Sequence, residues 1–333
     1  MINWKNKSVL VTGSCGTVGK ALILKLLKLK TKKIIAFDNS ERDITYLSES
    51  LSHKSIQFIL GDVRVYESIS NAVSMSDIIF HGAALKHVFL GEEWPDEIIQ
   101  TNIIGVQNLI KAAKKNSIEK VIFMSSDKAV NPTNVMGTSK LLAEKLFSAA
   151  HKINSKTIFS TTRFGNVLGS SGSVLPIILN QIDQKKNVTL TDKEMTRFIM
   201  SSSQAVELLI SAAEEAKGGE VFVTKMPSVK ISDLINVTID LYLSQKSLSQ
   251  KVLVKTIGKK VGEKLFEELI CPSESKRVHE TKDFYIIFSA LLNSKKISMK
   301  NLSSYRSDKV KLLSKKDLVK FYKRENILNN VER

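Results

Sequence analysis

The stretch "SVLVTGSCGTVG", residues 8–19, joins an apolar run rich in β-branched residues directly to a glycine-rich turn. Gly13, Gly16 and Gly19 follow the spacing G-x-x-G-x-x-G, and a helical pattern begins at Thr17. Glycines let such a turn pass close to a pyrophosphate, whose negative charge then lies at the N-terminus of the helix. The stretch therefore predicts the first strand, turn and helix of a dinucleotide-binding domain.

Short apolar runs alternate with helical patterns through the first half of the chain. The expected strands, each with several β-branched or aromatic residues, are 8–13, 33–38, 56–62, 77–83, 120–126 and 157–165. The helical patterns between them are 17–30, 41–52, 66–75, 94–116 and 137–152. Strands separated by helices form right-handed βαβ units around a parallel sheet. We expect an α/β protein with a Rossmann-like, doubly wound parallel sheet.

The pattern loosens after about residue 166 into helices, short strands and turns. The expected elements are helices at 203–216, 231–243 and 314–326 and a short strand at 220–226. Ser232 and Ser314 are the expected N-caps of the last two helices. We therefore predict an NAD(P)-binding domain over 1–165 and a smaller, mixed substrate-binding domain over 166–333, with the cleft between them and some later segments returning to the first domain.

The composition is that of a folded globular protein, with 43% hydrophobic and 25% charged residues among 333. The formal net charge of +17 comes from basic residues that are scattered rather than gathered in an Arg-rich block, so no nucleic-acid partner is expected. The apolar run "ALILKLLKL" is broken by Lys25 and Lys28 and is shorter than the ~20 residues of a membrane span. Two cysteines, Cys15 and Cys271, suit a reducing compartment. We expect a cytoplasmic protein that binds no membrane.

Acidic residues stand at the ends of the second and third expected strands. Asp38 is placed to accept hydrogen bonds from both hydroxyls of an adenosine ribose and to repel a 2′-phosphate, which favours NAD. Arg42 is near enough in sequence to pair with a phosphate, so NADP stays open. Asp62, beside Val63, is placed either to meet the adenine amino group or to cap a turn. Further expected cofactor contacts are Thr17, Val18, Ala83 and Ala84.

The stretch "SSDKAVNPTNVMGTSK", residues 125–140, contains an active-site pattern without its usual acid–base residue. The glycine turn and Lys140 resemble the extended short-chain dehydrogenase/reductase family, in which this Lys holds the nicotinamide ribose and lowers the pKa of a Tyr one helical turn earlier. Met136 stands in that place, and a thioether carries no proton. Asp127 and Lys128 offer an acid and a base instead; alone, they would also suit a solvated ion pair at a strand-end turn.

A wider set of segments resembles nucleotide-sugar 4,6-dehydratases, in order over nearly the whole chain. The segments are "HGAALKHV" (81–88), "TNIIGVQN" (101–108), the stretch 125–140, "RFGNVLGSSGSVLP" (163–176), "MTRFIMS" (195–201), "GEKLFEELI" (262–270) and "DFYIIF" (283–288). They are similar to UDP-N-acetylglucosamine 4,6-dehydratases of bacterial polysaccharide and nonulosonic acid synthesis, especially the soluble type of legionaminic acid pathways, some of which share the Met. The resemblance implies a hydro-lyase that moves hydride from C4 of a UDP-sugar to C6 through bound NAD. It also implies a homo-oligomer paired through the long helices.

The resemblance implies roles around the strand end. Asp127 would be the general acid at the C6 hydroxyl, and Lys128 the base at C5, with a pKa lowered by burial and by nearby Lys140. The 4-hydroxyl proton would pass through Ser126 or a water to Lys140 or Asp127. Met136 would face the substrate without titrating.

Other residues are expected to bind the UDP-sugar. Lys86 and His87 would lie near the nicotinamide and sugar, and Asn102 would position the active-site helix through a water. The remaining candidates, for the diphosphate, sugar, uridine and lid, are Arg163, Asn166, Ser173, Thr189, Thr191, Arg197, Glu263 and Lys264. Each of these, taken singly, would also suit a surface charge or a cap. No metal site is expected.

Two other functions stay open on the sequence. A nucleotide-sugar 4-epimerase needs only removal and return of hydride at C4 and usually keeps the Tyr, so Met136 and the Asp127–Lys128 pair count against it. A catalytically dead NAD-binding regulator would explain Met136 but not the retention of Asp127, Lys128 and Lys140 together. The residues do not decide between retention and inversion at C5, or between UDP and GDP.

Overall fold

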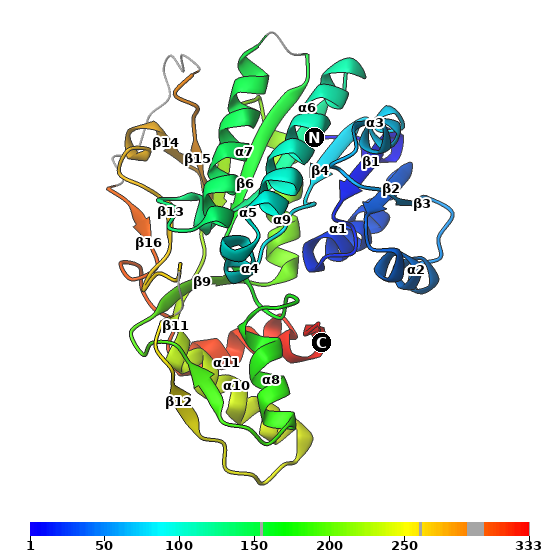
Figure 1. Cartoon of the computed structure of the whole chain (residues 1–333). Coiled ribbons are helices and arrows are strands. Elements are labelled where there is room, and N and C mark those ends of the chain that lie inside the picture. Colours follow the sequence, from blue (N-terminus) through cyan, green and yellow to red (C-terminus); the bar gives the residue numbers. More distant parts are fainter. Residues whose placement is uncertain (154–155, 260–261, 292–302, 333) are drawn as a thin grey trace.

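A nine-stranded sheet forms the centre of the computed structural model, which describes residues 1–153, 156–259, 262–291 and 303–332 (Figure 1). Its strands are β1 (Ser8–Thr12), β2 (Lys33–Asp38), β3 (Ile56–Leu60), β4 (Ile78–His81), β5 (Lys120–Ser126), β6 (Ile158–Phe164), β10 (Val221–Thr224), β14 (Val278–Glu280) and β15 (Phe284–Ile287). Their order is β14-β15-β10-β6-β5-β4-β1-β2-β3. The strands from β3 to β10 are parallel, and β15 and β14 add an antiparallel edge.

Helices cover both faces of this sheet. One face carries α1 (Thr17–Lys28), α2 (Glu41–Ser50) and α9 (Ser202–Glu215), and the other carries α3 (Tyr66–Ser74), α6 (Gly105–Lys115) and α7 (Val135–Lys152). Strand β5 shows why: Ile122 and Met124 pack into the first core, while Val121 and Phe123 pack into the second. A strand buried on both faces needs the continuous apolar run that the sequence has there. The predicted Rossmann-like, doubly wound α/β fold is confirmed.

The helix expected over 94–116 is interrupted. The chain instead forms α4 (Val88–Glu93), α5 (Pro95–Ile99), a π-helical turn (Gln100–Ile104) and then α6. Pro95 starts a new helix at its N1 position, where a missing N–H has no cost. The π turn directs Asn102 inward, where its side-chain amide bonds Ser139 Oγ on α7 and both backbone groups of Leu85.

The two expected N-caps had different outcomes. Ser314 accepts a hydrogen bond from the backbone N–H of Asp317 and caps α11 (Lys315–Arg324), as predicted. The prediction for Ser232 is wrong, because Lys230, two residues earlier, is the N-cap of α10 (Ile231–Lys246).

A smaller body lies below the carboxyl edge of the sheet (Figure 1). It contains α8 (Val174–Asp183), α10 and α11, with a core of its own. Its sheet pairs β8 (Val188–Leu190) with β12 (Val254–Thr256). The sheet of β7 (Asn166–Val167), β9 (Thr196–Met200) and β11 (Ser228–Lys230) contributes to both cores, and the pair β13 (Glu268–Ile270) and β16 (Tyr305–Arg306) packs into the core of the large sheet. Segments on both sides of residue 165 therefore build the larger body, since β10, β14 and β15 join its sheet and α9 packs on one face. In the part of the chain that the structure describes, no helix combines the length and apolar character of a membrane crossing.

Candidate active site

A cavity of about 700 Å³ runs along the carboxyl ends of the parallel strands. The predicted site residues that line it are Gly13, Gly16, Thr17, Val18, Gly19, Asp38, Asp62, Val63, Ala83, Ala84, Lys86, His87, Ser126, Asp127, Lys128, Met136, Lys140, Asn166 and Ser173. Those outside its lining are Arg42, Asn102, Arg163, Thr189, Thr191, Arg197 and Glu263. The cavity thus joins the glycine turn and the stretch 125–140 in one space, where open parallel sheets bind ligands.

The glycine turn packs too closely for side chains at two positions. Gly13 has φ +70°, and a Cβ there would lie 2.7 Å from the backbone nitrogen of Ala83. A Cβ at Gly19 would lie 2.3 Å from the carbonyl oxygen of Gly13. The turn leads into α1, whose N-cap, Gly16, has no side chain to satisfy the first N–H groups. These groups and the helix dipole fit an anionic group such as a pyrophosphate.

Asp38 connects the end of β2 to this turn. One carboxylate oxygen accepts a hydrogen bond from the backbone N–H of Cys15 at 2.9 Å, and the other accepts one from Ser40 at 3.2 Å. Because the carboxylate also lines the cavity, it fits the ribose of a dinucleotide whose pyrophosphate lies on α1. Arg42 lies outside the cavity lining, and its 80% exposed side chain pairs with Asp43, so its contact with the cofactor stays a prediction.

Asp62 holds a turn at the end of β3. Its carboxylate accepts hydrogen bonds from the backbone and the side chain of Arg64, while the residue still lines the cavity. Burial raises the pKa of Asp62, but the hydrogen bonds from Arg64 outweigh it, and the net pKa is lowered. The turn role and the cavity position that the sequence left as alternatives therefore occur together.

The acid–base pair lies at the end of β5. Asp127 is 1% exposed, and its Oδ1 accepts hydrogen bonds from Ser126 Oγ at 2.7 Å and from Lys128 Nζ at 3.1 Å. Its Oδ2 is buried and has no hydrogen-bond partner among the described residues. A carboxyl oxygen without a partner, in a group that lines the cavity, is free to bond a ligand atom.

The surroundings of Lys128 differ from those expected. Burial lowers the pKa of this amine, but Asp127 and then Glu267 outweigh it, so the net pKa is raised. Glu267 Oε1 lies 3.7 Å from Lys128 Nζ. The predicted lowering of the pKa is therefore wrong, because two carboxylates face the amine and Lys140 is not its neighbour. The sequence prediction missed Glu267, although it lies in the quoted segment 262–270.

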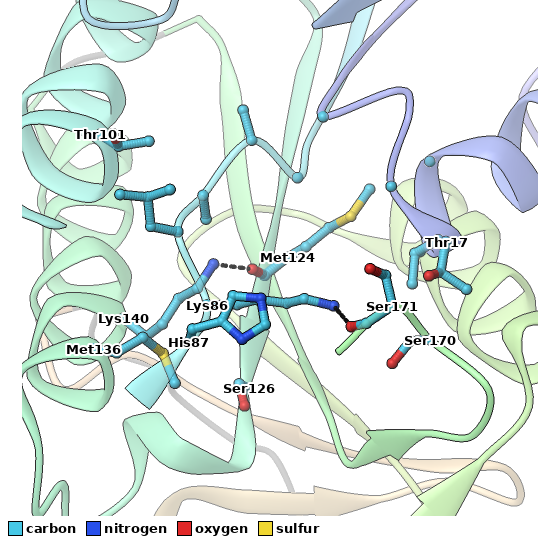
Figure 2. Close-up of a pocket in the computed structure, with 18 of the residues that line it drawn as sticks. Thr17, Lys86, His87, Thr101, Met124, Ser126, Met136, Lys140, Ser170 and Ser171 are labelled. Carbon is cyan, nitrogen blue, oxygen red and sulfur yellow. Dashed lines mark hydrogen bonds between the residues drawn. The ribbon is translucent and has the colours of Figure 1, made fainter. Parts of the chain in front are cut away.

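Lys140 and Met136 reach into the cavity from consecutive turns of α7 (Figure 2). Lys140 Nζ donates a hydrogen bond to the carbonyl oxygen of Met124 at 3.0 Å. Burial lowers the pKa of Lys140 to about 8, and Glu144 offsets part of this effect. Met136 is 2% exposed. This wall of the cavity thus carries one titrating group and one apolar group.

A loop from the smaller body closes the cavity opposite this wall. Lys86 Nζ donates to the carbonyl oxygen of Ser171 at 2.7 Å (Figure 2). His87 packs on Gly172, which has φ +66° and where a Cβ would lie 2.4 Å from the imidazole. In the same wall, Asn166 Oδ1 and Ser173 Oγ are buried without a hydrogen-bond partner among the described residues. These atoms fit the polar groups of a ligand between the two bodies.

Arg163 does not reach a ligand. Its side chain is 1% exposed, and its five N–H groups bond Glu144, Glu274 and the carbonyl oxygen of Leu269. No donor is left for a phosphate. The structure therefore contradicts its assignment to the substrate and makes it the centre of a buried ion cluster.

Arg197 and Lys264 hold the lid segment 262–270 rather than the cavity. Arg197 donates to the carbonyl oxygens of Thr196, Lys264 and Leu265. Lys264 Nζ donates to two carbonyl oxygens of the loop that follows Lys128. Glu263, in the same segment, is half-buried outside the cavity lining. The structure does not bring Arg197 to the substrate cavity, because the residue is buried outside the cavity lining and bonds three backbone carbonyl oxygens.

The last three predicted substrate residues also lie away from the cavity. Asn102 bonds Ser139 Oγ directly at 2.9 Å, rather than through a water, so it positions α7 and does not bind substrate. The amide of Gln181 bonds both the N–H and the hydroxyl of Thr189 on β8, and the hydroxyl of Thr191 contacts the sulfur of Met195. Neither Thr lines the cavity, and a uracil contact through their backbone groups stays a prediction.

Comparisons with known proteins agree with this arrangement. The family described as "Polysaccharide biosynthesis protein" matches residues 9–289. The chain is 44% identical over 323 residues to an uncharacterized membrane protein of Methanocaldococcus jannaschii, covering 96% of each. It is 39% identical over 288 residues to a UDP-glucose 4-epimerase of Rickettsia bellii, covering 85% of this chain and 83% of that protein.

Solved structures show the same fold. The X-ray structure of Pen from Bacillus thuringiensis superposes with a TM-score of 0.92 at 39% identity, covering 98% of this chain and 99% of that one. A dTDP-glucose 4,6-dehydratase from Streptomyces venezuelae, solved with NAD, superposes with a TM-score of 0.69 at 18% identity, covering 78% and 86%, and shows the fold alone. The chain belongs to the polysaccharide biosynthesis protein family, which has the extended short-chain dehydrogenase/reductase fold.

Proposed function

We propose that this protein is a nucleotide-sugar 4,6-dehydratase that converts UDP-N-acetylglucosamine to a UDP-4-keto-6-deoxy-N-acetylhexosamine for bacterial surface polysaccharide or nonulosonic acid synthesis. One observation carries the proposal: Asp127 and Lys128 line the same cavity as the glycine turn and Lys140. Loss of water across C5 and C6 needs a base and an acid in addition to the group that handles the C4 hydroxyl. Epimerisation at C4 needs neither.

The cofactor in this proposal is NAD. The N-terminus of α1 would hold its pyrophosphate, Asp38 the adenosine ribose and Lys140 the nicotinamide ribose. Bound NAD would supply the acceptor for a hydride from C4 and the donor of a hydride to C6. The cavity wall with Asn166 and Ser173 would hold the UDP-sugar opposite Met136.

The chain's own groups can move every proton that the reaction requires. Ser126 donates to Asp127 Oδ1, so a proton that leaves the 4-hydroxyl through Ser126 arrives on Asp127. The neutral form of Lys128 would remove the C5 proton, and Asp127 would return its proton to the C6 hydroxyl, which departs as water. Lys128 would then protonate C5, so both groups end in their starting states and the sugar has lost one molecule of water.

A labelled substrate tests the proposal. UDP-N-acetylglucosamine carrying deuterium at C4 is incubated with the protein and NAD and is followed by NMR. A dehydratase gives a 4-keto product with the deuterium in its new C6 methyl group. Deuterium that stays on C4 in a sugar of inverted configuration would instead establish an epimerase.

The second candidate is a nucleotide-sugar 4-epimerase, which is favoured by the name of the Rickettsia bellii relative. Met136 counts against it, because the position lacks the phenol that would exchange a proton with the C4 hydroxyl. If the protein binds NAD but the substrate keeps both its deuterium and its configuration at C4, the protein is the catalytically dead regulator.

A further inference from the structure

We propose that Glu267 is the proton partner of Lys128, a positioning residue that lets this amine act as a base. The inference rests on the proposed dehydration. Glu267 directly precedes β13 in the lid segment, and its side chain is 4% exposed. Its Oε1 lies 3.7 Å from Lys128 Nζ, and its Oε2 is buried with no hydrogen-bond partner in the described part of the chain. A buried carboxylate oxygen without a donor is costly unless it gains a proton.

Lys128 needs such a partner to remove a proton from C5. An ammonium group is not a base, and here two carboxylates, Asp127 at 3.1 Å and Glu267, stabilise its charge. Transfer of one proton breaks an N–H bond of Lys128 and forms an O–H bond on Glu267. The products are a neutral amine and a neutral carboxylic acid, so the pair's net charge stays the same and no proton enters solvent.

The charged groups around Glu267 permit this transfer. Lys128, Asp127, Arg197 and Lys264 face it. The Nε of Arg197 lies 3.8 Å away, while the terminal nitrogens of Arg197 and the Nζ of Lys264 donate to backbone carbonyl oxygens. Burial raises the pKa of the Glu267 carboxyl, Lys128 lowers it, Asp127 raises it, and the net shift is upward. The protonated acid is therefore more accessible here than in water.

The backbone fixes Glu267 but leaves Lys128 room to approach. The N–H of Glu267 donates to Ser307 Oγ, and its carbonyl oxygen accepts from the N–H of Ser307. The Lys128 side chain is 26% exposed. Movement of its end by roughly 0.8 Å would convert the 3.7 Å separation into a direct hydrogen bond. The segment 262–270 thus holds the Glu267 carboxylate in place, and the end of the Lys128 side chain moves toward it.

The test is the pH dependence of 4-keto product formation by wild type and Glu267→Gln. In wild type the proton stays within the pair, so the pair itself adds no slope to the kcat profile from pH 7 to 9, and the titration of Lys140 near pH 8 is common to all variants and cancels in the ratio of their kcat values. In the variant Lys128 must release its proton to solvent. We expect the ratio of variant to wild-type kcat to be about 1/100 at pH 7 and to rise close to tenfold per pH unit toward pH 9, whereas a variant that keeps the pair has a level ratio. Glu267→Asp, which keeps the carboxyl group, should recover part of the rate and the level ratio.

Glu268→Gln is the matched control. Glu268 is the adjacent buried carboxylate, but it bonds Asn131 and does not pair with Lys128. The ratio of its variant's kcat to the wild-type kcat should be level from pH 7 to 9. Lys128→Met combined with Glu267→Gln should be no slower than Lys128→Met alone, because Glu267 acts only through the amine.

Three results would overturn the inference. They are a fall in kcat of Glu267→Gln that is equal at every pH, no fall in its kcat, or a kcat of the double variant below that of Lys128→Met alone. Failure of the proposed function looks different, since wild type itself would then make no 4-keto product at any pH.

Discussion

The Nζ of Lys140 donates a hydrogen bond to the carbonyl oxygen of Met124 at 3.0 Å, which ties α7 to β5 at the edge of the cavity. The ammonium also lies 4.8 Å from the centre of the Phe123 ring. Met136, one turn earlier on the same helix, offers only a weak thioether acceptor. The strand, rather than the neighbour on the helix, therefore holds this amine, and position 136 has no proton to exchange.

Met136→Leu should leave catalysis nearly unchanged. Leucine has a similar volume and is equally unable to titrate, and such swaps in a packed site usually cost under about 1.5 kcal/mol. We expect kcat and KM within about threefold of wild type, measured as 4-keto product by NMR. Lys140→Met, one turn away, should lose most activity. A large fall in kcat for a folded Met136→Leu protein would show that the thioether has a role in catalysis.

Lys128→Ala should block the reaction after C4 is oxidised. The base acts only at C5, so hydride can still leave C4, but elimination cannot follow. We expect product formation to fall by about 10³-fold, with reduced nicotinamide accumulating as absorbance near 340 nm. The affinity for NAD, measured by calorimetry, should hold, because the glycine turn and Asp38 are separate from this pair. Full 4-keto product from Lys128→Ala would refute the base assignment.

Asp38→Asn should weaken the preference for NAD over NADP. The amide keeps an oxygen for the N–H of Cys15 but removes the charge that repels a 2′-phosphate. We expect the ratio of the two Kd values to shift toward NADP by about tenfold, or ~1.4 kcal/mol. Asp43→Asn is the control, because that carboxylate pairs with Arg42 and it is the backbone N–H of Asp43 that bonds the N-cap serine of α2. An unchanged ratio of the Kd values for NAD and NADP in Asp38→Asn would show that Asp38 does not bind the adenosine ribose.

The parts of the site that the sequence predicted are those set by local structure. Gly13 and Asp38 act within single strand–turn units, so their spacing along the chain is enough to predict them. Arg163 is different: its partners Glu144 and Glu274 lie 19 and 111 residues away, and an Arg before a glycine turn looks the same whether it faces a phosphate or two carboxylates. Glu267 could not be predicted for the same reason, since only the folded segment 262–270 places it beside Lys128.

Arg163→Met should destabilise the protein rather than weaken substrate binding. The change leaves the Glu144 and Glu274 carboxylates buried without their common cation, and breaking such a cluster costs about 3–5 kcal/mol. Urea unfolding at neutral pH should show this loss, while KM for the UDP-sugar changes little in the folded fraction. Arg42→Met, which removes an exposed arginine, should change stability by less than about 0.5 kcal/mol. If Arg163→Met instead raised KM for the UDP-sugar and left the free energy of unfolding unchanged, Arg163 would be a substrate-binding residue.

Lys140 should make stability depend on pH in a defined window. Burial lowers its folded pKa to about 8, against 10.5 for the ordinary side chain. Between these values the unfolded chain binds a proton that the folded protein does not, so the free energy of unfolding rises with pH, by at most about 1.4 kcal/mol per unit. The difference in this free energy between wild type and Lys140→Met should be level below pH 8 and should then grow in favour of wild type toward pH 10. Urea unfolding at a series of pH values measures it, and the subtraction cancels the other titrating groups. Parallel curves would mean that this amine has an ordinary pKa in the folded protein, which would contradict a buried Lys140 bonded to β5.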